Sequence, residues 1–125
     1  MIKELAGVVI WTENVIRLKT FYEDILGLCP NSVRKDFVSY KWDKVKFSIG
    51  KHALLEGTSS DQYRIMINFN VDDIHHTTEQ LKRHGVQFMR EPEQEHWGGH
   101  VATFTDPDQN IIQLLQQPFI DAKKS

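Results

Sequence analysis

The chain has 125 residues, 40% of them hydrophobic and 26% charged, and its formal net charge is −2 at pH 7. This length and composition predict one globular domain with a substantial buried core. A weakly acidic chain lacks the clustered basic face that nucleic-acid binding needs. No stretch approaches the roughly 20 apolar residues of a membrane span.

The first residues, M-I-K-E-L-A-G-V-V-I-W, lack the apolar run of a signal peptide, and we therefore expect a cytoplasmic protein. The single cysteine, Cys29, cannot form an intramolecular disulfide, which fits a reducing compartment. We expect Cys29 to be a small buried residue, as free cysteines commonly are.

The first half of the chain predicts a strand, a helix and three further strands. Leu5–Trp11 is a short apolar run. Apolar residues then recur at the spacing of an amphipathic helix, which Gly27 ends: Val15, Leu18, Phe21, Tyr22, Ile25 and Leu26. Turn residues separate the three strands that follow, which are Phe37–Trp42, Val45–Ile49 and His52–Glu56.

Two features of these strands concern the side chains on the two faces of the sheet. Tyr40 and Trp42 share one face because side chains alternate along a strand, and the sequence does not choose which face. Basic residues are interspersed with acidic ones, which predicts a solvated surface of mixed charge; they are Arg34, Lys35, Lys41, Lys44, Lys46 and Lys51, with Asp36 and Asp43.

The second half repeats this order of elements. Tyr63–Val71 alternates apolar and polar residues, which is the clearest strand pattern in the chain. A helix begins after Asp72-Asp73 and ends at Gly85, with Ile74, Thr78, Leu81 and Lys82 in its pattern. The last three strands are an extended Val86–Met89 and a hairpin of Val101–Thr105 and Ile111–Gln116, joined by the turn residues Asp106–Asn110.

The two halves superpose without a large insertion. Gly27 corresponds to Gly85 (85 − 27 = 58), and Asn14 corresponds to Asp73 (73 − 14 = 59). Glu56 then falls near Gln113 (113 − 56 = 57). The sequence therefore predicts two copies of a β-α-β-β-β module, over about residues 5–57 and 63–117, with a linker at 58–62.

Two segments carry a family resemblance, F-Y-E-D-I-L-G-L (Phe21–Leu28) and W-G…F-T-D-P-D-Q-N-I-I-Q-L (Trp97–Leu114). Together they resemble the signatures of the vicinal oxygen chelate (VOC) superfamily of glyoxalases, extradiol dioxygenases, fosfomycin-modifying enzymes and bleomycin-binding resistance proteins. The resemblance implies an α+β fold and a single VOC domain over residues 1–125. In that fold two tandem βαβββ modules form curved half-barrel sheets around a concave cavity, commonly in a homodimer.

Metal-dependent members of the superfamily carry one ligand on the first strand and one on the last strand of each module. The resemblance places these positions at Gly7, Glu56, Met66 and Gln113. Only Glu56 is a convincing ligand for a hard divalent cation, because Gly7 has no side chain, Met66 is a soft thioether and Gln113 is neutral. A further departure is Gln109, where the family usually has glycine; a positive φ there would cost roughly 1 kcal/mol.

Alternation along the strands then predicts which side chains line the cavity. Besides the four carried-over positions, these are Val9, Trp11, His52, Leu54, Asn68, Asn70, Ile111 and Leu115. The opposite faces are apolar and face the helices, with Val8, Ile10, Ala53, Leu55, Ile65, Ile67, Phe69, Ile112 and Leu114. Trp97 beside Gly98-Gly99 either caps the pocket or covers the hairpin.

The histidines give a weaker signal. His75, His76 and His84 belong to the second helix and are expected in solvent, His52 begins a strand, and His96 and His100 flank W-G-G. His100 with Glu56 either forms an unconventional metal or acid–base pair or is a surface histidine.

The pattern favours a metal-free binding protein that sequesters an apolar or aromatic small molecule, similar to the bleomycin-binding, antibiotic-resistance branch. No cofactor is expected, and the partners expected are a small-molecule ligand and a second copy of the chain. The alternatives are a vestigial pocket or a metal-dependent lyase or isomerase of glyoxalase type, acting on a small oxygenated substrate with Glu56 as base or as ligand of a divalent metal. The predicted ligand-binding residues are Trp11, Glu56, Met66, Asn68, Asn70, Trp97 and Gln113.

Overall fold

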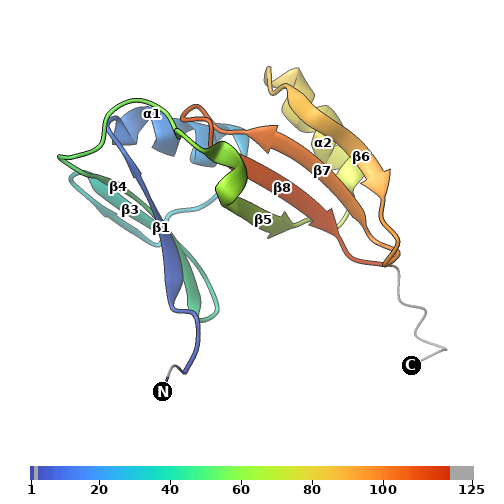
Figure 1. The fold of residues 1–125 in the computed structure, drawn as a ribbon, viewed down its shortest axis with the longest axis horizontal. Coiled ribbons are helices and arrows are strands. Elements are labelled where there is room, and N and C mark those ends of the chain that lie inside the picture. Colours follow the sequence, from blue (N-terminus) through green and yellow to red (C-terminus); the bar gives the residue numbers. More distant parts are fainter. Residues whose placement is uncertain (2, 119–125) are drawn as a thin grey trace. The chain divides into compact units, whose positions relative to one another are not determined.

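A computed structural model describes residues 1 and 3–118 (Figure 1). The chain divides into two compact units, Met1–Thr58 and Ser59–Ser125. Each unit holds a four-stranded mixed sheet with one helical segment in the connection after its first strand. The predicted α+β fold with two βαβββ modules is confirmed.

The first unit contains β1 (Gly7–Thr12), α1 (Val15–Thr20), a π-helix η1 (Phe21–Ile25), β2 (Ser32–Arg34), β3 (Phe37–Trp42) and β4 (Val45–Lys51). Its sheet has the order β1-β4-β3-β2. The β1 and β4 strands are parallel, whereas β3 is antiparallel to both β2 and β4.

The predicted strand at His52–Glu56 is wrong, because this segment is a turn and loop. The imidazole Nδ1 of His52 accepts the backbone N–H of Leu54 at 3.1 Å, and the His52 carbonyl accepts the N–H of Leu55 at 3.2 Å. These local bonds turn the chain away from the sheet. The remaining strand of the module is instead β2, the first strand after the helix, which the sequence pattern did not predict.

The predicted first helix is present and consists of an α-helical segment followed by a π-helical one. The side chain of Asn14 caps α1 by accepting the N–H of Arg17 at 3.0 Å. The second half widens to a π-helix, in which the N–H of Leu26 donates to the carbonyl of Phe21 at 3.1 Å. Gly27 then has φ +79°, the left-handed conformation predicted for it at the end of the helix.

The second unit contains a short 3₁₀ helix η2 (Gln62–Arg64), β5 (Met66–Asn70), α2 (Ile74–Arg83), β6 (Phe88–Gln94), β7 (His100–Thr105) and β8 (Ile111–Gln116). Its sheet repeats the order of the first unit, β5-β8-β7-β6, with β5 and β8 parallel. The β6 strand extends past Pro92 because it lies at the sheet edge and its register with β7 is shifted.

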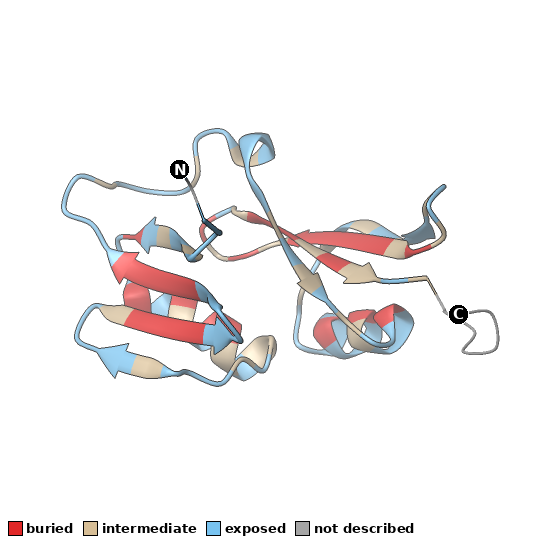
Figure 2. Cartoon of the chain, turned by 90° about the horizontal axis from the view of Figure 1, so that it is seen from below, coloured by how far each residue is buried: buried red, intermediate tan, exposed pale blue. Residues whose placement is uncertain are grey.

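Helices cover one face of each sheet. In the second unit α2 packs against β6, β7 and β8, and it buries Ile74, Thr78 and Leu81. In the first unit the buried aromatic core joins Tyr22 of η1 to Phe47 of β4, with ring centroids 5.1 Å apart. Figure 2 marks in red the buried residues along the strands and helices of both units. The opposite face is called the helix-free face below.

The strand pairing fixes which residues share each face. Asn68 pairs with Gln113, which pairs with Thr103, whereas Ile67 pairs with Ile112 on the other face. This is the division that the alternation of Tyr63–Val71 predicts. In the first unit Tyr40 is buried and stacks on Phe47, with ring centroids 6.0 Å apart, so that Tyr40 and Trp42 belong to the helix-covered face.

Candidate functional site

The helix-free face of the first unit carries an aromatic floor, formed by Trp11 and Phe37 over Gly50. These three residues lie in one row across β1, β4 and β3. The two ring centroids are 6.2 Å apart, and a Cβ atom on Gly50 would lie 2.7 Å from each ring. The absence of a side chain at Gly50 therefore lets both rings lie against the strand. His52 packs edge-on to Trp11 at 5.4 Å.

Trp11 remains available to a ligand because 43% of its surface is exposed. An exposed indole held by neighbouring rings offers a flat surface for stacking. Phe37 and Gly50 were not among the residues predicted for the site. Phe37 could have been found from the alternation of F-V-S-Y-K-W, but its place beside Trp11 depends on strand pairing.

Two polar rows follow the aromatic floor along the same face. In the next row the hydroxyls of Ser39 and Ser48 are hydrogen-bonded at 2.8 Å. One row further, Lys41 and Lys46 are paired directly across β3 and β4, and both are exposed. The strands β1–β4 contain no aspartate or glutamate. The charged residues predicted to form a solvated surface are all exposed, but the two acidic ones, Asp36 and Asp43, occupy turns and not strands.

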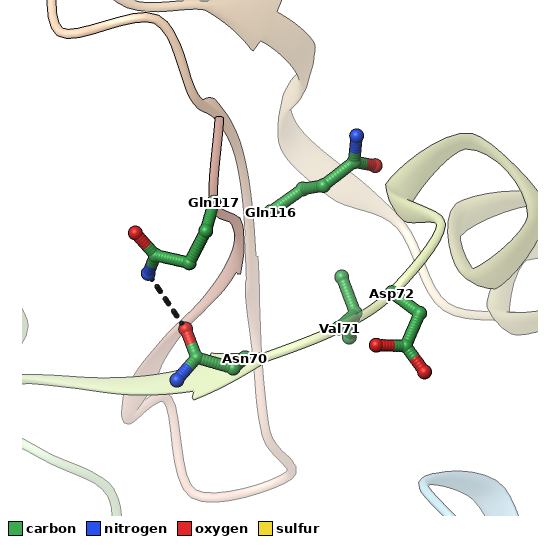
Figure 3. Close-up of a pocket in the computed structure, with 5 residues that line it drawn as sticks. All are labelled: Asn70, Val71, Asp72, Gln116 and Gln117. Carbon is green, nitrogen blue, oxygen red and sulfur yellow. Dashed lines mark hydrogen bonds between the residues drawn. The ribbon is translucent and has the colours of Figure 1, made fainter. Parts of the chain in front are cut away.

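The corresponding face of the second unit is lined by neutral amides and a hydroxyl. Asn68 lies beside Gln113, whose amide nitrogen donates to Thr103 Oγ1 at 3.3 Å. At the end of the strand, the amide of Gln117 donates to Asn70 Oδ1 at 2.9 Å (Figure 3). That pair borders an open pocket of about 300 Å³, lined by Asn70, Val71, Asp72, Gln116 and Gln117.

Trp97 lies in the turn between β6 and β7, and its ring packs on Gly99 so closely that a Cβ there would overlap it. The ring is 42% exposed.

The guanidinium of Arg90, on β6, pairs with Glu95 at 2.8 Å and with Glu93 at 3.4 Å. The hydrogen bonds to these carboxylates raise the pKa of Arg90, which stays a cation.

The predicted ligand-binding residues fall on both units. Trp11 belongs to the first unit, and five others belong to the second: Met66, Asn68, Asn70, Trp97 and Gln113. Asn68 and Gln113 are brought together as neighbours on β5 and β8. Glu56 is exposed in the loop after the turn at His52 and is not on a strand.

The position that corresponds to Gln113 in the first unit is Ser48, and the predicted correspondence with Glu56 is wrong. Gly7 and Met66 each lie seven residues before the N-cap of a helix, Asn14 or Asp73 (14 − 7 and 73 − 66). Gly7 pairs with Lys46, and Met66 pairs with Ile111. Two residues further along the last strand lie Ser48 and Gln113 respectively.

The four positions that hold the metal in metal-dependent relatives are therefore a glycine, a serine, a methionine and a glutamine: Gly7, Ser48, Met66 and Gln113. None carries a carboxylate or an imidazole, and this donor set does not fit a hard divalent cation. Within residues 1 and 3–118, no three His, Cys, Asp or Glu side chains are grouped so that they could share a metal ion.

The remaining candidates lie outside the helix-free faces. His100 stands edge-on to His75 of α2, with ring centroids 5.8 Å apart, and therefore faces the helix. His75, His76 and His84 are exposed, as predicted. Cys29 is also exposed, so its predicted burial is wrong; it lies in the connection between η1 and β2.

Each unit has the element order βαβββ and one four-stranded mixed sheet. This places the protein in the class with paired βαβββ modules. The chain belongs to the glyoxalase/bleomycin resistance protein/dioxygenase superfamily, whose model matches residues 4–114. None of the helices in the described part of the chain is long and apolar enough to cross a bilayer.

The chain is also similar to individual proteins. The chain is 30% identical over 124 residues to the uncharacterized protein YetH of Bacillus subtilis (strain 168), covering 93% of this chain and all of YetH. Among solved structures, it resembles a glyoxalase/dioxygenase from Nostoc punctiforme with a TM-score of 0.78 at 14% identity, covering 94% of this chain and 92% of that one. A glyoxalase/bleomycin resistance protein/dioxygenase from Nocardioides gives 0.77 at 15% identity, covering 94% and 85%.

Proposed function

We propose that the protein binds an apolar or aromatic small molecule without a metal and sequesters it. The observation that carries this proposal is the aromatic floor, in which Trp11 is half-exposed and is held with Phe37 over Gly50. The donor set at the family's metal positions supports binding rather than metal chemistry. Neutral hydrogen-bonding groups beside an apolar surface are the usual make-up of a small-molecule site.

In this proposal each unit is considered by itself. On the helix-free face of the first unit, Trp11 offers a surface on which an aromatic ring stacks. On the helix-free face of the second unit, the amides of Asn68, Asn70 and Gln113 offer hydrogen bonds to polar groups, with Met66 as a soft apolar contact. Trp97 offers an exposed ring in the turn between β6 and β7 of the same unit.

The direct test is a titration with 2-naphthalenemethanol, a neutral aromatic probe, followed by tryptophan fluorescence and calorimetry. Trp11→Ala should weaken binding by about fivefold, since stacking on one aromatic side chain contributes of the order of 1 kcal/mol. Trp42→Ala is the matched control because Trp42 is similarly exposed, at 48%, but belongs to the helix-covered face. Equal loss in both variants, or no binding by the wild type, would contradict the proposal.

A second test concerns the metal. We expect the purified protein to contain far less than one metal ion per chain, and Ni²⁺, Zn²⁺, Mn²⁺ or Fe²⁺ should leave its Tm unchanged. A stoichiometric metal that is lost in Glu56→Ala would instead support a lyase or isomerase of glyoxalase type.

We further propose that the protein acts as a homodimer in the cytoplasm, as its family suggests. Sedimentation equilibrium should then give twice the chain mass of 14.6 kDa. A single-chain mass at micromolar concentration would contradict the dimer without affecting the binding proposal.

A further inference from the structure

We propose that the ligand is an aromatic anion whose ring lies on the floor of Trp11 and Phe37 and whose acidic group is held by Lys41 and Lys46. This inference rests on the proposed binding function and specifies the charge of the ligand. It uses the helix-free face of the first unit alone.

The first argument is the pairing of the two lysines. Lys41 and Lys46 are directly opposite each other on β3 and β4, where Cβ atoms lie about 5 Å apart and like charges oppose each other. Neither ammonium group has an ion-pair partner among residues 1 and 3–118. An anion placed between them would relieve this repulsion and would be bound by two charges.

The second argument is the lack of any carboxylate on this sheet. The cations Arg34, Lys41 and Lys46 all belong to the helix-free face by strand pairing. The nearest acidic residues in sequence, Asp36 and Asp43, are held in turns with φ of 61° and 49°. The face is therefore complementary to a negative charge and unsuited to a cationic ligand.

The third argument is the order of the rows. From Gly50 beneath the aromatic rings to Lys46 is four residues of strand, or about 13 Å. The row between holds the hydrogen-bonded hydroxyls of Ser39 and Ser48. A ligand with a fused aromatic system spans much of this length, and the flexible stems of the lysines cover the remainder. Arg34 is adjacent to Phe37 but lies on β2, at the sheet edge away from Trp11.

The experiment compares three probes that share one ring system: 2-naphthoate, neutral 2-naphthalenemethanol and the cation 2-naphthylmethylammonium. Wild-type protein should bind 2-naphthoate about fivefold more tightly than the alcohol, since two exposed ion pairs contribute of the order of 1 kcal/mol together. Added salt should reduce this preference because it screens exposed charges. The ammonium probe should bind most weakly.

The double variant Lys41→Gln/Lys46→Gln should bind the acid and the alcohol equally. The matched control is Lys51→Gln, which removes an exposed cation of β4 that alternates to the other face and should keep the preference. Gly50→Ala should weaken all three probes, since its Cβ would displace both rings. If Gly50→Ala does not fold by circular dichroism, Trp11→Ala tests the floor instead.

The outcomes separate the inference from the function on which it rests. If no naphthalene probe binds, the proposed function fails. If the alcohol and the acid bind equally to wild type, or if the ammonium binds best, the function stands and the charge assignment is overturned. A preference that survives Lys41→Gln/Lys46→Gln but is lost in Arg34→Gln would overturn the assignment to the lysine pair. Another outcome is that the double variant loses a dimer without any change in probe affinity. That result would show that this face contacts a second copy of the chain, and it would also overturn the assignment of the lysine pair to the ligand.

Discussion

Ser48 Oγ lies 2.8 Å from Ser39 Oγ, on neighbouring strands of the first unit, and one of the two hydroxyls donates a hydrogen bond to the other. Gln113 and Thr103 hold the same register positions in the second unit and are also hydrogen-bonded, at 3.3 Å. Each unit thus has a polar contact of its own between its last strand and the strand before it. In each unit this contact includes the position where metal-dependent relatives carry a ligand.

The serine contact makes a prediction about stability. Ser48→Ala should lower the free energy of unfolding by about 1–3 kcal/mol, because it leaves the buried hydroxyl of Ser39 without a partner. The double variant Ser39→Ala/Ser48→Ala removes both polar groups and should lose less than either single variant. Urea unfolding of the four proteins measures this cycle. A double variant that loses the sum of the two single losses would contradict the contact.

Tyr40 gives a prediction about alkaline pH. Burial, together with the hydrogen bond that its hydroxyl donates to Glu23 at 2.9 Å and the charge of that carboxylate, raises the pKa of Tyr40. An unfolded tyrosine has a pKa near 10. The folded protein keeps its proton more tightly, so this stabilisation is complete below pH 10 and is lost as the pH rises.

Above pH 10, wild-type protein should therefore lose up to about 1.4 kcal/mol of stability per pH unit more than Tyr40→Phe, which has no phenol to ionise. Tyr63→Phe is the control, because Tyr63 is 65% exposed. Chemical unfolding at several pH values between 9 and 11.5 measures the difference. Parallel curves for wild type and Tyr40→Phe would show that the contact with Glu23 does not hold the phenol protonated.

The fold could be predicted from the sequence wherever the signal is local. The alternation at Tyr63–Val71 assigns Asn68 and Ile67 to opposite faces because one face must be apolar. Gly27 and Gly85 end helices because each adopts a positive φ, +79° and +88°. These features depend only on neighbouring residues and therefore appear in the sequence itself.

The strands of the first unit were harder to predict because β2 has three residues and is held by pairing with β3. The apolar residues after His52 resemble a strand, but the chain turns there, and the His52 imidazole accepts the backbone N–H of Leu54. This error moved the last strand of the module by one element. A last strand at His52–Glu56 would make Glu56 the counterpart of Gln113, whereas the strand pairing makes it Ser48.

The candidate site shows the same division. Trp11 could be identified because it occupies an alternating strand position next to an apolar run. The contact of Trp11 with Phe37 over Gly50 depends on β1 and β4 being parallel and paired in one register. That pairing joins residues about forty positions apart and leaves no local pattern.

The turn between β7 and β8 depends on Asp106, whose carboxylate is buried. Oδ1 accepts the backbone N–H groups of Asp108 and Asn110 at 2.9 Å each, and Oδ2 accepts the Asn110 amide at 2.9 Å. Asp106→Ala should lower the free energy of unfolding by at least about 2 kcal/mol, since it leaves these donors unpaired. Asp106→Asn keeps one acceptor and should lose less. Equal losses in the two variants, measured by urea unfolding, would contradict this role.

Gln109 in the same turn has φ +68°, a left-handed conformation that is costly for any residue with a Cβ. Its N–H donates to the carbonyl of Asp106 at 3.0 Å, so the turn geometry holds it there. Gln109→Gly should raise the free energy of unfolding by up to about 1 kcal/mol, because the relief of strain is partly offset by the entropy of an unfolded glycine. Gln109→Ala keeps the Cβ and should show no gain. Both variants should have the wild-type slope in urea unfolding, and destabilisation by glycine would mean that the side chain of Gln109 itself supports the turn.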